Sequence, residues 1–187
     1  MKKYDVVALG ELLVDFTENG MSKQGNPMLE ANPGGAPCNV LSMLQNLGKT
    51  TAFIGKVGAD AFGRMLIDAV KNQGINTENL MLDENVHTTL AFVHTEEDGD
   101  RDFSFYRNPG ADMMLQWDEV NQDMLGDTKI FHFGTLSMTE KQIETVTKRA
   151  VEKAKAEGAW ISFDPNLRPP LWKRLEDAKT QMWYGIS

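Results

Sequence analysis

The sequence lacks three features that would assign a protein to a specialised class. Cys38 is its only cysteine, so no internal disulfide can form, and no Cys or His stands near it at metal-ligand spacing. No run of Lys and Arg occurs, and 19 basic against 27 acidic residues leave a net charge of -8, which disfavours nucleic acid and anionic membranes as partners. No apolar stretch approaches the roughly 20 residues of a membrane helix, and the run after Asp5 is too short for a signal-peptide core. These absences predict a cytoplasmic protein with neither nucleic-acid nor membrane partners.

The overall composition is that of a folded domain. The chain has 187 residues, of which 41% are hydrophobic and 25% are charged. Domains usually contain roughly 100 to 200 residues, and this balance is typical of globular rather than disordered proteins. We therefore expect one folded unit with a sizeable core.

Short apolar runs and helical patterns alternate along the chain. The runs end at glycine or at Asp-Pro, as buried strands often do; they cover 4–9, 51–57, 129–133 and 159–163. Apolar residues at helical spacing lie between the runs. The signals for helix starts are Pro37, Asp60 and a capping box of Ser137 with Glu140, and those for helix ends are Gly48 and Gly74. This alternation predicts an α/β fold with a Rossmann-like, mostly parallel sheet and helices on both faces.

Four further strand patterns come in pairs, with no helix between the members of a pair. The first pair covers 12–17 and 28–31, and the second covers 88–95 and 101–107. Asp98-Gly99 lies between the last two, which is a strong signal for a hairpin turn. Because these strands lack crossover helices, we expect them to form one small accessory sheet inserted in the α/β domain.

Residues 32–39, Asn-Pro-Gly-Gly-Ala-Pro-Cys-Asn, are the most informative stretch. Gly34 and Gly35 come just before a predicted helix, so backbone N–H groups can approach a ligand closely there. Asn39 lies one turn into that helix and can direct its amide at the same ligand. The arrangement suits a polyhydroxy compound, and a tight strand-to-helix turn without a ligand explains it equally well.

Two charged residues are expected at the same edge of the sheet. Asp15 follows the first strand and Arg168 follows the run 159–163, and open α/β sheets bind ligands outside the carboxyl ends of their strands. A carboxylate such as Asp15 can accept two hydroxyl hydrogen bonds from a sugar. An ordinary exposed loop residue is the alternative in both cases.

Aromatic residues and an arginine alternate in the strand pattern 101–107. Phe103, Phe105 and Arg107 are spaced two residues apart, so they are expected to share one face of the strand. Two aromatic rings followed by a guanidinium are unusual for a plain core. This face predicts a lid over a ligand.

These motifs together resemble the ribokinase-like sugar kinases, also called the PfkB family. The matching segments are 10–15, 34–39, Gly48, Gly58, 103–112 and 164–172. The last two are similar to fructokinase segments more than to those of ribokinase or adenosine kinase. Leu41 departs from the family signature, which usually has a small residue there, and it leaves the ligand-facing positions intact.

The resemblance implies a fold, an activity and a site. Residues 1–187 would form the N-terminal portion of a PfkB-type kinase domain, with β-lid strands near 12–31 and 88–107. A fructokinase-like enzyme of this kind phosphorylates fructose to fructose 6-phosphate with ATP and Mg2+. The exposed apolar face of the lid would be a candidate homodimer surface. The substrate-binding positions of the family fall on Asp15, Gly34, Gly35, Asn39, Phe105, Arg107 and Arg168.

Members of the family are substantially longer than this chain. Their glycine-rich anion hole, catalytic aspartate and most of the nucleotide site would follow Ser187, so the resemblance implies no catalytic residue here and no phosphorylation of fructose by this chain alone. A kinase of 2-keto-3-deoxygluconate is one alternative, because its lid also carries an aromatic and arginine pair. A truncated, non-catalytic sugar-binding or interaction module is another.

Overall fold

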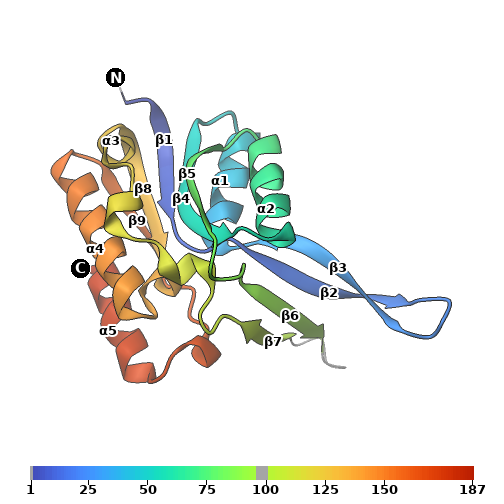
Figure 1. Cartoon of the computed structure of the whole chain (residues 1–187). Coiled ribbons are helices and arrows are strands. Elements are labelled where there is room, and N and C mark those ends of the chain that lie inside the picture. The colour runs from blue at the N-terminus through green and yellow to red at the C-terminus, as the bar shows by residue number, and fades with distance from the viewer. Residues whose placement is uncertain (1, 96–100) are drawn as a thin grey trace.

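The computed structural model describes residues 2–95 and 101–187, which form an α/β core with a smaller sheet at one end (Figure 1). The hairpin turn predicted at Asp98-Gly99 lies outside the described residues. No helix in the described part of the chain is long and apolar enough to cross a membrane.

The core contains a five-stranded parallel sheet in the order β5-β4-β1-β8-β9. Its strands are β1 (Tyr4–Leu9), β4 (Thr51–Gly58), β5 (Asn76–Asp83), β8 (Thr128–Gly134) and β9 (Trp160–Asp164). The four strands predicted from apolar runs are confirmed. The sequence pattern does not indicate β5, because this strand lies at the edge of the sheet and residues 76–79 are all polar.

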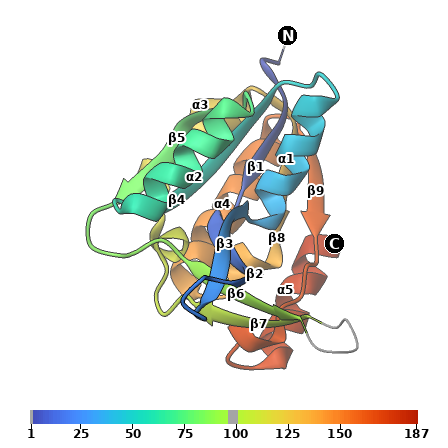
Figure 2. The ribbon, with the colours of Figure 1, turned by 90° about the vertical axis from the view of Figure 1, so that its right-hand side faces the viewer.

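Helices cover both faces of this sheet, as the alternation predicts (Figures 1 and 2). One face carries α1 (Ala36–Asn46) and α2 (Ala61–Asn72), and the other carries α3 (Gln122–Gly126), α4 (Lys141–Ala156) and α5 (Leu175–Ile186). Successive residues of β1 point to opposite faces. Val6 packs in the core beneath α1 and α2, whereas Val7 packs in the core beneath α4. Burial on both faces explains why β1 is apolar from Val6 to Leu9.

The ends of α1 and α2 follow from their flanking residues. The Asp60 carboxylate caps α2 by accepting the Gly63 N–H at 2.8 Å, and Pro37 occupies the first turn of α1. Gly48 and Gly74 follow the two helices with φ angles of 73° and 85°. Glycine adopts this left-handed conformation at little cost and commonly ends helices for that reason.

The predicted capping box of α4 is wrong. Ser137 lies in a 3-10 helix, η3 (Thr135–Met138), and its hydroxyl donates to the Gly134 carbonyl at 2.9 Å. Glu140 is itself the N-cap of α4 and makes no side-chain capping bond. Ser137, which the spacing predicts as the N-cap of α4, instead belongs to the 3-10 turn that follows β8. Other short 3-10 helices are η1 (Ala111–Met114), η2 (Trp117–Glu119) and η4 (Pro169–Leu171).

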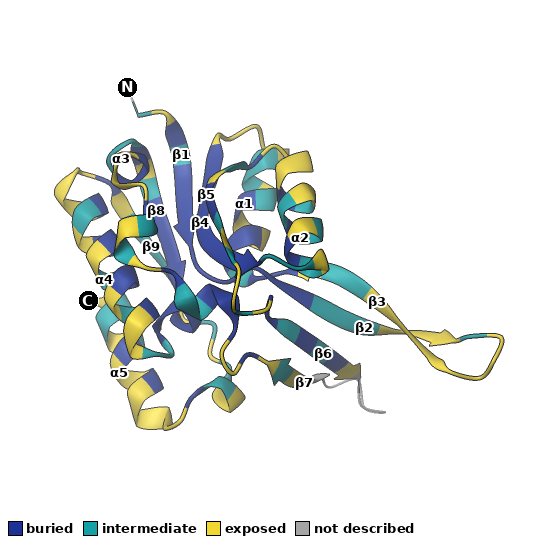
Figure 3. Ribbon diagram, viewed as in Figure 1, coloured by how far each residue is buried: buried dark blue, intermediate teal, exposed yellow. Residues whose placement is uncertain are grey.

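The remaining four strands form the small accessory sheet that the paired patterns predict, and we call it the β lid. Its order is β3 (Pro27–Gly34), β2 (Leu13–Met21), β6 (Leu90–Thr95) and β7 (Arg101–Tyr106). Pairs β2–β3 and β6–β7 are antiparallel, and β2 runs parallel to β6. The β2–β3 hairpin projects away from the core, and its outer half is exposed (Figure 3).

Candidate functional site

The carboxyl ends of β1 and β8 meet where the winding of the core sheet reverses. The chain leaves β1 through the first lid hairpin and α1 to reach β4 on one side, and it leaves β8 through α4 to reach β9 on the other. Open α/β sheets form a ligand crevice at such a topological switch point. The fold therefore indicates a site at this place before any side chain is considered.

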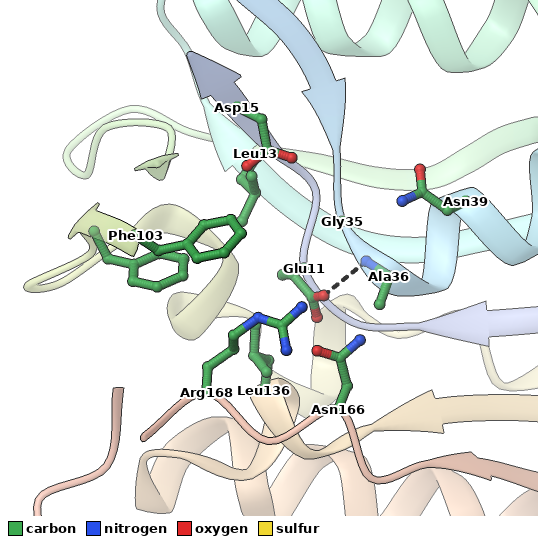
Figure 4. A pocket seen from close by; sticks show the side chains of 11 residues that line it. Glu11, Leu13, Asp15, Gly35, Ala36, Asn39, Phe103, Leu136, Asn166 and Arg168 are labelled. Atoms are coloured by element: carbon green, nitrogen blue, oxygen red, sulfur yellow. Dashed lines mark hydrogen bonds between the residues drawn. The ribbon is translucent and has the colours of Figure 1, made fainter. Parts of the chain in front are cut away.

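A pocket lies at this switch point, between the core and the β lid (Figure 4). Its volume is about 120 Å³, below the roughly 300 Å³ at which drug-sized sites begin, so it suits a small ligand. Polar side chains reach it from the loop after β1, from β2, from α1 and from the loop after β9. The lining residues are Glu11, Leu13, Asp15, Gly35, Ala36, Asn39, Phe103, Phe105, Leu136, Asn166 and Arg168.

Two glycines allow the start of α1 to lie against the loop that follows β1. Gly35 has a φ of 123°, which side-chain-bearing residues rarely adopt, and a Cβ atom there would collide with the Glu11 carbonyl oxygen. A Cβ atom at Gly34 would collide with the Asp15 carboxylate. Gly35 lines the pocket, and Gly34 leaves room for Asp15 beside it.

Asp15 and Arg168 bring opposite charges to the pocket. Asp15 is half-buried on β2; burial raises the pKa of its carboxyl, and the nearby Arg168 charge opposes that rise. Arg168 follows β9, and its guanidinium lies over the Phe103 ring, 5.6 Å from the centroid. An acceptor of hydrogen bonds and a cation thus face the same small space.

Asn39 and Asn166 add amide groups from opposite sides of the pocket. Asn39 is exposed near the start of α1, as the sequence predicts. The sequence motifs do not single out Asn166, although its position just past a strand's carboxyl end is a signal that could identify it. Its backbone N–H and its Nδ2 donate to the Asp164 carboxylate at 3.0 and 3.1 Å. The Asp164 carboxylate therefore holds the Asn166 amide in place.

Glu11 is the second functional candidate that sequence reasoning missed. It follows β1 and is 2% exposed, and its Oε1 accepts the Ala36 N–H at 2.9 Å. Its Oε2 is buried and has no hydrogen-bond partner among the described residues. Burial raises the pKa of this carboxyl to about 7, against the opposing effect of backbone hydrogen bonds from Glu11 itself and Ala36. A charged residue just past a buried strand, after Gly10, is the signal that could have identified it.

The β lid contributes two aromatic rings. Phe103 and Phe105 are stacked on one face of β7, with centroids 5.9 Å apart and an interplanar angle of 12°. Both rings line the pocket. The predicted shared face of these two phenylalanines is confirmed.

Arg107 does not share that face. β7 ends at Tyr106, and the Arg107 side chain turns into the protein, where it is 2% exposed. Its Nε and Nη2 donate to Asp112 Oδ2 at 2.8 and 2.6 Å, and Nη2 also donates to the Leu136 carbonyl at 2.8 Å. Its Nη1 donates to the Thr139 hydroxyl at 2.9 Å. The expected place of Arg107 on the ligand-facing side of the lid is therefore wrong, because buried acceptors engage its donors.

The structure thus gathers most of the predicted site residues and separates one of them. Asp15, Gly35, Asn39, Phe105 and Arg168 line one pocket, Gly34 packs against Asp15, and Arg107 lies outside the lining. Across residues 2–95 and 101–187, no group of three or more His, Cys, Asp or Glu side chains is placed to hold a metal ion.

Comparison with known families identifies the family of this chain. The model of the pfkB family carbohydrate kinases matches residues 3–186. The chain therefore belongs to the pfkB family of carbohydrate kinases.

Within this family, the chain is similar to proteins named fructokinase. The chain is 43% identical to probable fructokinase-3 of Arabidopsis thaliana, over 95% of this chain and 52% of that protein. Its structure matches that of fructokinase from Xylella fastidiosa with bound ATP at a TM-score of 0.89 and 34% identity, over 98% of this chain and 55% of that one. A double mutant of Vibrio cholerae O395 fructokinase, bound to fructose, ADP and potassium ion, matches at a TM-score of 0.86 and 28% identity. This match covers 100% of this chain and 58% of that one. The chain spans about half the length of the curated relatives it matches.

Proposed function

We propose that this chain forms the sugar-binding part of an ATP-dependent kinase that converts fructose to fructose 6-phosphate. The observation that carries the proposal is the small pocket at the switch point, where Asp15, Asn39, Asn166 and Arg168 converge. Family membership supports the class of reaction. Relatives that carry the name fructokinase support the choice of sugar.

The pocket chemistry suits hydroxyl groups. A carboxylate accepts hydroxyl hydrogen bonds, and an amide both accepts and donates them. Asp15 would accept two hydroxyls of the sugar, the two asparagine amides would bind others, and the stacked rings of Phe103 and Phe105 would cover the sugar from the lid side. Exclusion of water by such a cover protects a phosphoryl group from hydrolysis during transfer.

The nucleotide requires groups beyond this pocket. Phosphoryl transfer depends on positioning and on charge stabilisation, and Arg168 is the cation of this pocket that would approach the transferred group. The family resemblance implies that the catalytic aspartate and most of the nucleotide site lie outside this pocket. On that basis we propose that ATP with Mg2+ binds mainly to other parts of the kinase.

A kinase of 2-keto-3-deoxygluconate is the second candidate. Its substrate is an anion and requires a cation that is free to pair with it. Arg107, the lid arginine that could have served, is paired with Asp112, and Arg168 shares the pocket with Asp15 and Glu11. This balance of charge favours a neutral sugar such as fructose.

Isothermal titration calorimetry of the 187-residue chain tests the choice of ligand. We expect heat of binding with fructose and none with 2-keto-3-deoxygluconate, and the reverse result would overturn the proposed sugar. A parallel assay of ADP formation is expected to show none with fructose and ATP. ADP release that depends on fructose and on this chain alone would contradict the proposal that the catalytic base lies elsewhere.

The same measurements address a non-catalytic binding module. A version extended through the part that fructokinase relatives have in addition should form ADP in the presence of fructose. Fructose binding with no ADP formation by that extended version would instead favour a binding module.

We propose the β lid as a homodimer surface. Met21, Met28 and Leu29 are exposed near the tip of its β2–β3 hairpin, at 61%, 43% and 45%, and exposed apolar side chains that gather in one region are typical of protein interfaces. Light scattering after size exclusion should give twice the chain mass of 20.9 kDa, and Leu29→Glu should reduce the mass to that of one chain.

We also propose a cytoplasmic location, which the buried, unpaired thiol of Cys38 supports.

A further inference from the structure

Glu11 lies at the centre of the polar side of the pocket. It follows β1, and its carboxylate reaches the start of α1, where Oε1 accepts the Ala36 N–H at 2.9 Å. Figure 4 shows this bond, and Asn166 and Arg168 line the same pocket. Glu11 is 2% exposed and lines the pocket together with Asp15.

The second oxygen of this carboxyl is the informative atom. Oε2 is buried and has no hydrogen-bond partner among the residues that the structure describes. Buried polar atoms are almost always paired, because an unpaired one loses its hydration without compensation. Because Glu11 lines the pocket, a ligand bound there that shifts the carboxyl is the partner that we expect for Oε2.

We propose that Glu11 is a substrate-positioning carboxyl, in which Oε1 holds the start of α1 and Oε2 accepts the hydrogen bond of a sugar hydroxyl. This inference rests on the proposed sugar-binding function. Glu11 would be the second sugar-binding carboxylate of the pocket, beside Asp15, and the affinity for the sugar would depend on the ionisation of Glu11.

The surroundings of Glu11 set the pH range of this effect. Burial raises its pKa to about 7; the Arg107 charge opposes the rise and the Asp112 charge adds to it. Asp15 and Arg168 share the pocket, and Cys38 on α1 is a buried thiol whose own pKa is raised, by burial first and then by Glu11. Glu11 therefore changes ionisation near neutral pH. In the ionised form Oε2 accepts a hydroxyl, and in the protonated form Oε2 carries the proton.

Glu11→Gln tests the proposal without a change of shape. The amide oxygen still accepts the Ala36 N–H, and a donor NH2 replaces Oε2. We expect the fructose affinity of the wild type to rise about tenfold from pH 6 to pH 8, since ionisation changes about tenfold per pH unit below the pKa. The variant should bind about tenfold more weakly at pH 8 and show a flat profile. Glu84→Gln, which removes an exposed carboxylate, should keep the wild-type profile.

A second measurement uses the wild type alone. Fructose binding at pH 7 should release about half a proton, because the bound hydroxyl favours the ionised carboxyl. Calorimetry in buffers of different ionisation enthalpy measures this number. Binding without proton release would overturn the inference even if Glu11→Gln failed to fold.

The outcomes separate the inference from the function on which it rests. Fructose binding by both proteins with the same pH profile would assign the dependence to Asp15 or another group and overturn the role of Glu11 alone. No fructose binding by the wild type at any pH would overturn the proposed function and this inference with it.

Discussion

Arg107 and Asp112 form an ion pair inside the protein, with Nη2 and Oδ2 2.6 Å apart and both side chains 2% exposed. Arg107 follows β7 and also donates to the carbonyl of Leu136 in the pocket wall. Asp112 accepts the hydroxyl of Thr89, the residue before β6, at 2.5 Å. One ion pair therefore fixes both inner ends of the β6–β7 hairpin to the core.

Removal of one partner of this pair should destabilise the fold. Arg107→Met leaves Asp112 buried without a counter-charge, and such a change typically costs about 3–5 kcal/mol. We expect that loss in the free energy of unfolding, measured by urea denaturation. The double variant Arg107→Met with Asp112→Leu should recover part of it. Arg64→Met, on the exposed side of α2, is the matched control, and an equal effect of the two arginine changes would refute the structural role of the pair.

Gly35→Ala should abolish sugar binding through a collision. The φ of 123° disfavours alanine, at a cost of about 1–3 kcal/mol, and the new methyl group would meet the Glu11 carbonyl. Gly158→Ala separates these two effects, since Gly158 also has a positive φ, 81°, with nothing within 4 Å of an added Cβ. The control should lose some stability and bind fructose normally. Normal fructose binding by Gly35→Ala would contradict the packing described here.

The stability of the protein should depend on pH through Glu11. The pKa of its carboxyl is raised from 4.5 to about 7 on folding, so between these values the folded state binds more protons than the unfolded chain. The contribution of Glu11 to stability therefore falls as pH rises through this window and is constant above it. The full change is about 3 kcal/mol. In urea unfolding, the stability of Glu11→Gln relative to the wild type should increase from pH 5 to pH 8. A difference in the free energy of unfolding that stays constant over this range would disprove the raised pKa.

Asp15→Asn should weaken fructose binding without loss of stability. A hydrogen bond to a charged group contributes about 1.5–3 kcal/mol, which corresponds to roughly a tenfold to hundredfold loss of affinity. Stability should hold, because burial already disfavours the charged form of Asp15. Calorimetry and urea unfolding measure the two quantities, with Asp68→Asn on the exposed face of α2 as the control. Unchanged affinity would remove Asp15 from the site.

Most of the fold could be predicted from local pattern, since strands buried on both faces of a parallel sheet are short apolar runs. The pattern fails at β5, whose polar residues 76–79 lie at the sheet edge. It also fails at the start of α4, where an additional 3-10 turn displaces Ser137 from the cap. Both failures occur where tertiary position, rather than local preference, decides the structure.

In the site, too, local sequence pattern predicts some residues and tertiary position decides another. Asp15, Gly35 and Asn39 could be predicted, because each follows a strand end or begins a helix at the edge where ligands bind. Arg107 could not, because two-residue alternation holds only within a strand and β7 ends at Tyr106. Its ion-pair partner, Asp112, lies on η1, so the sequence pattern of the strand gives no indication of it.

The parallel pairing of β2 with β6 joins two hairpins that are distant in the chain, and Val14 lies opposite Leu90. Contacts of such long sequence separation require the intervening chain to close a loop and are slow to form. Asp15 belongs to the first hairpin and Phe105 to the second, so the pocket exists only when both hairpins are joined. Fructose binding would therefore report that the two hairpins have joined, and a chain with full helix content but separate hairpins would be unable to bind sugar.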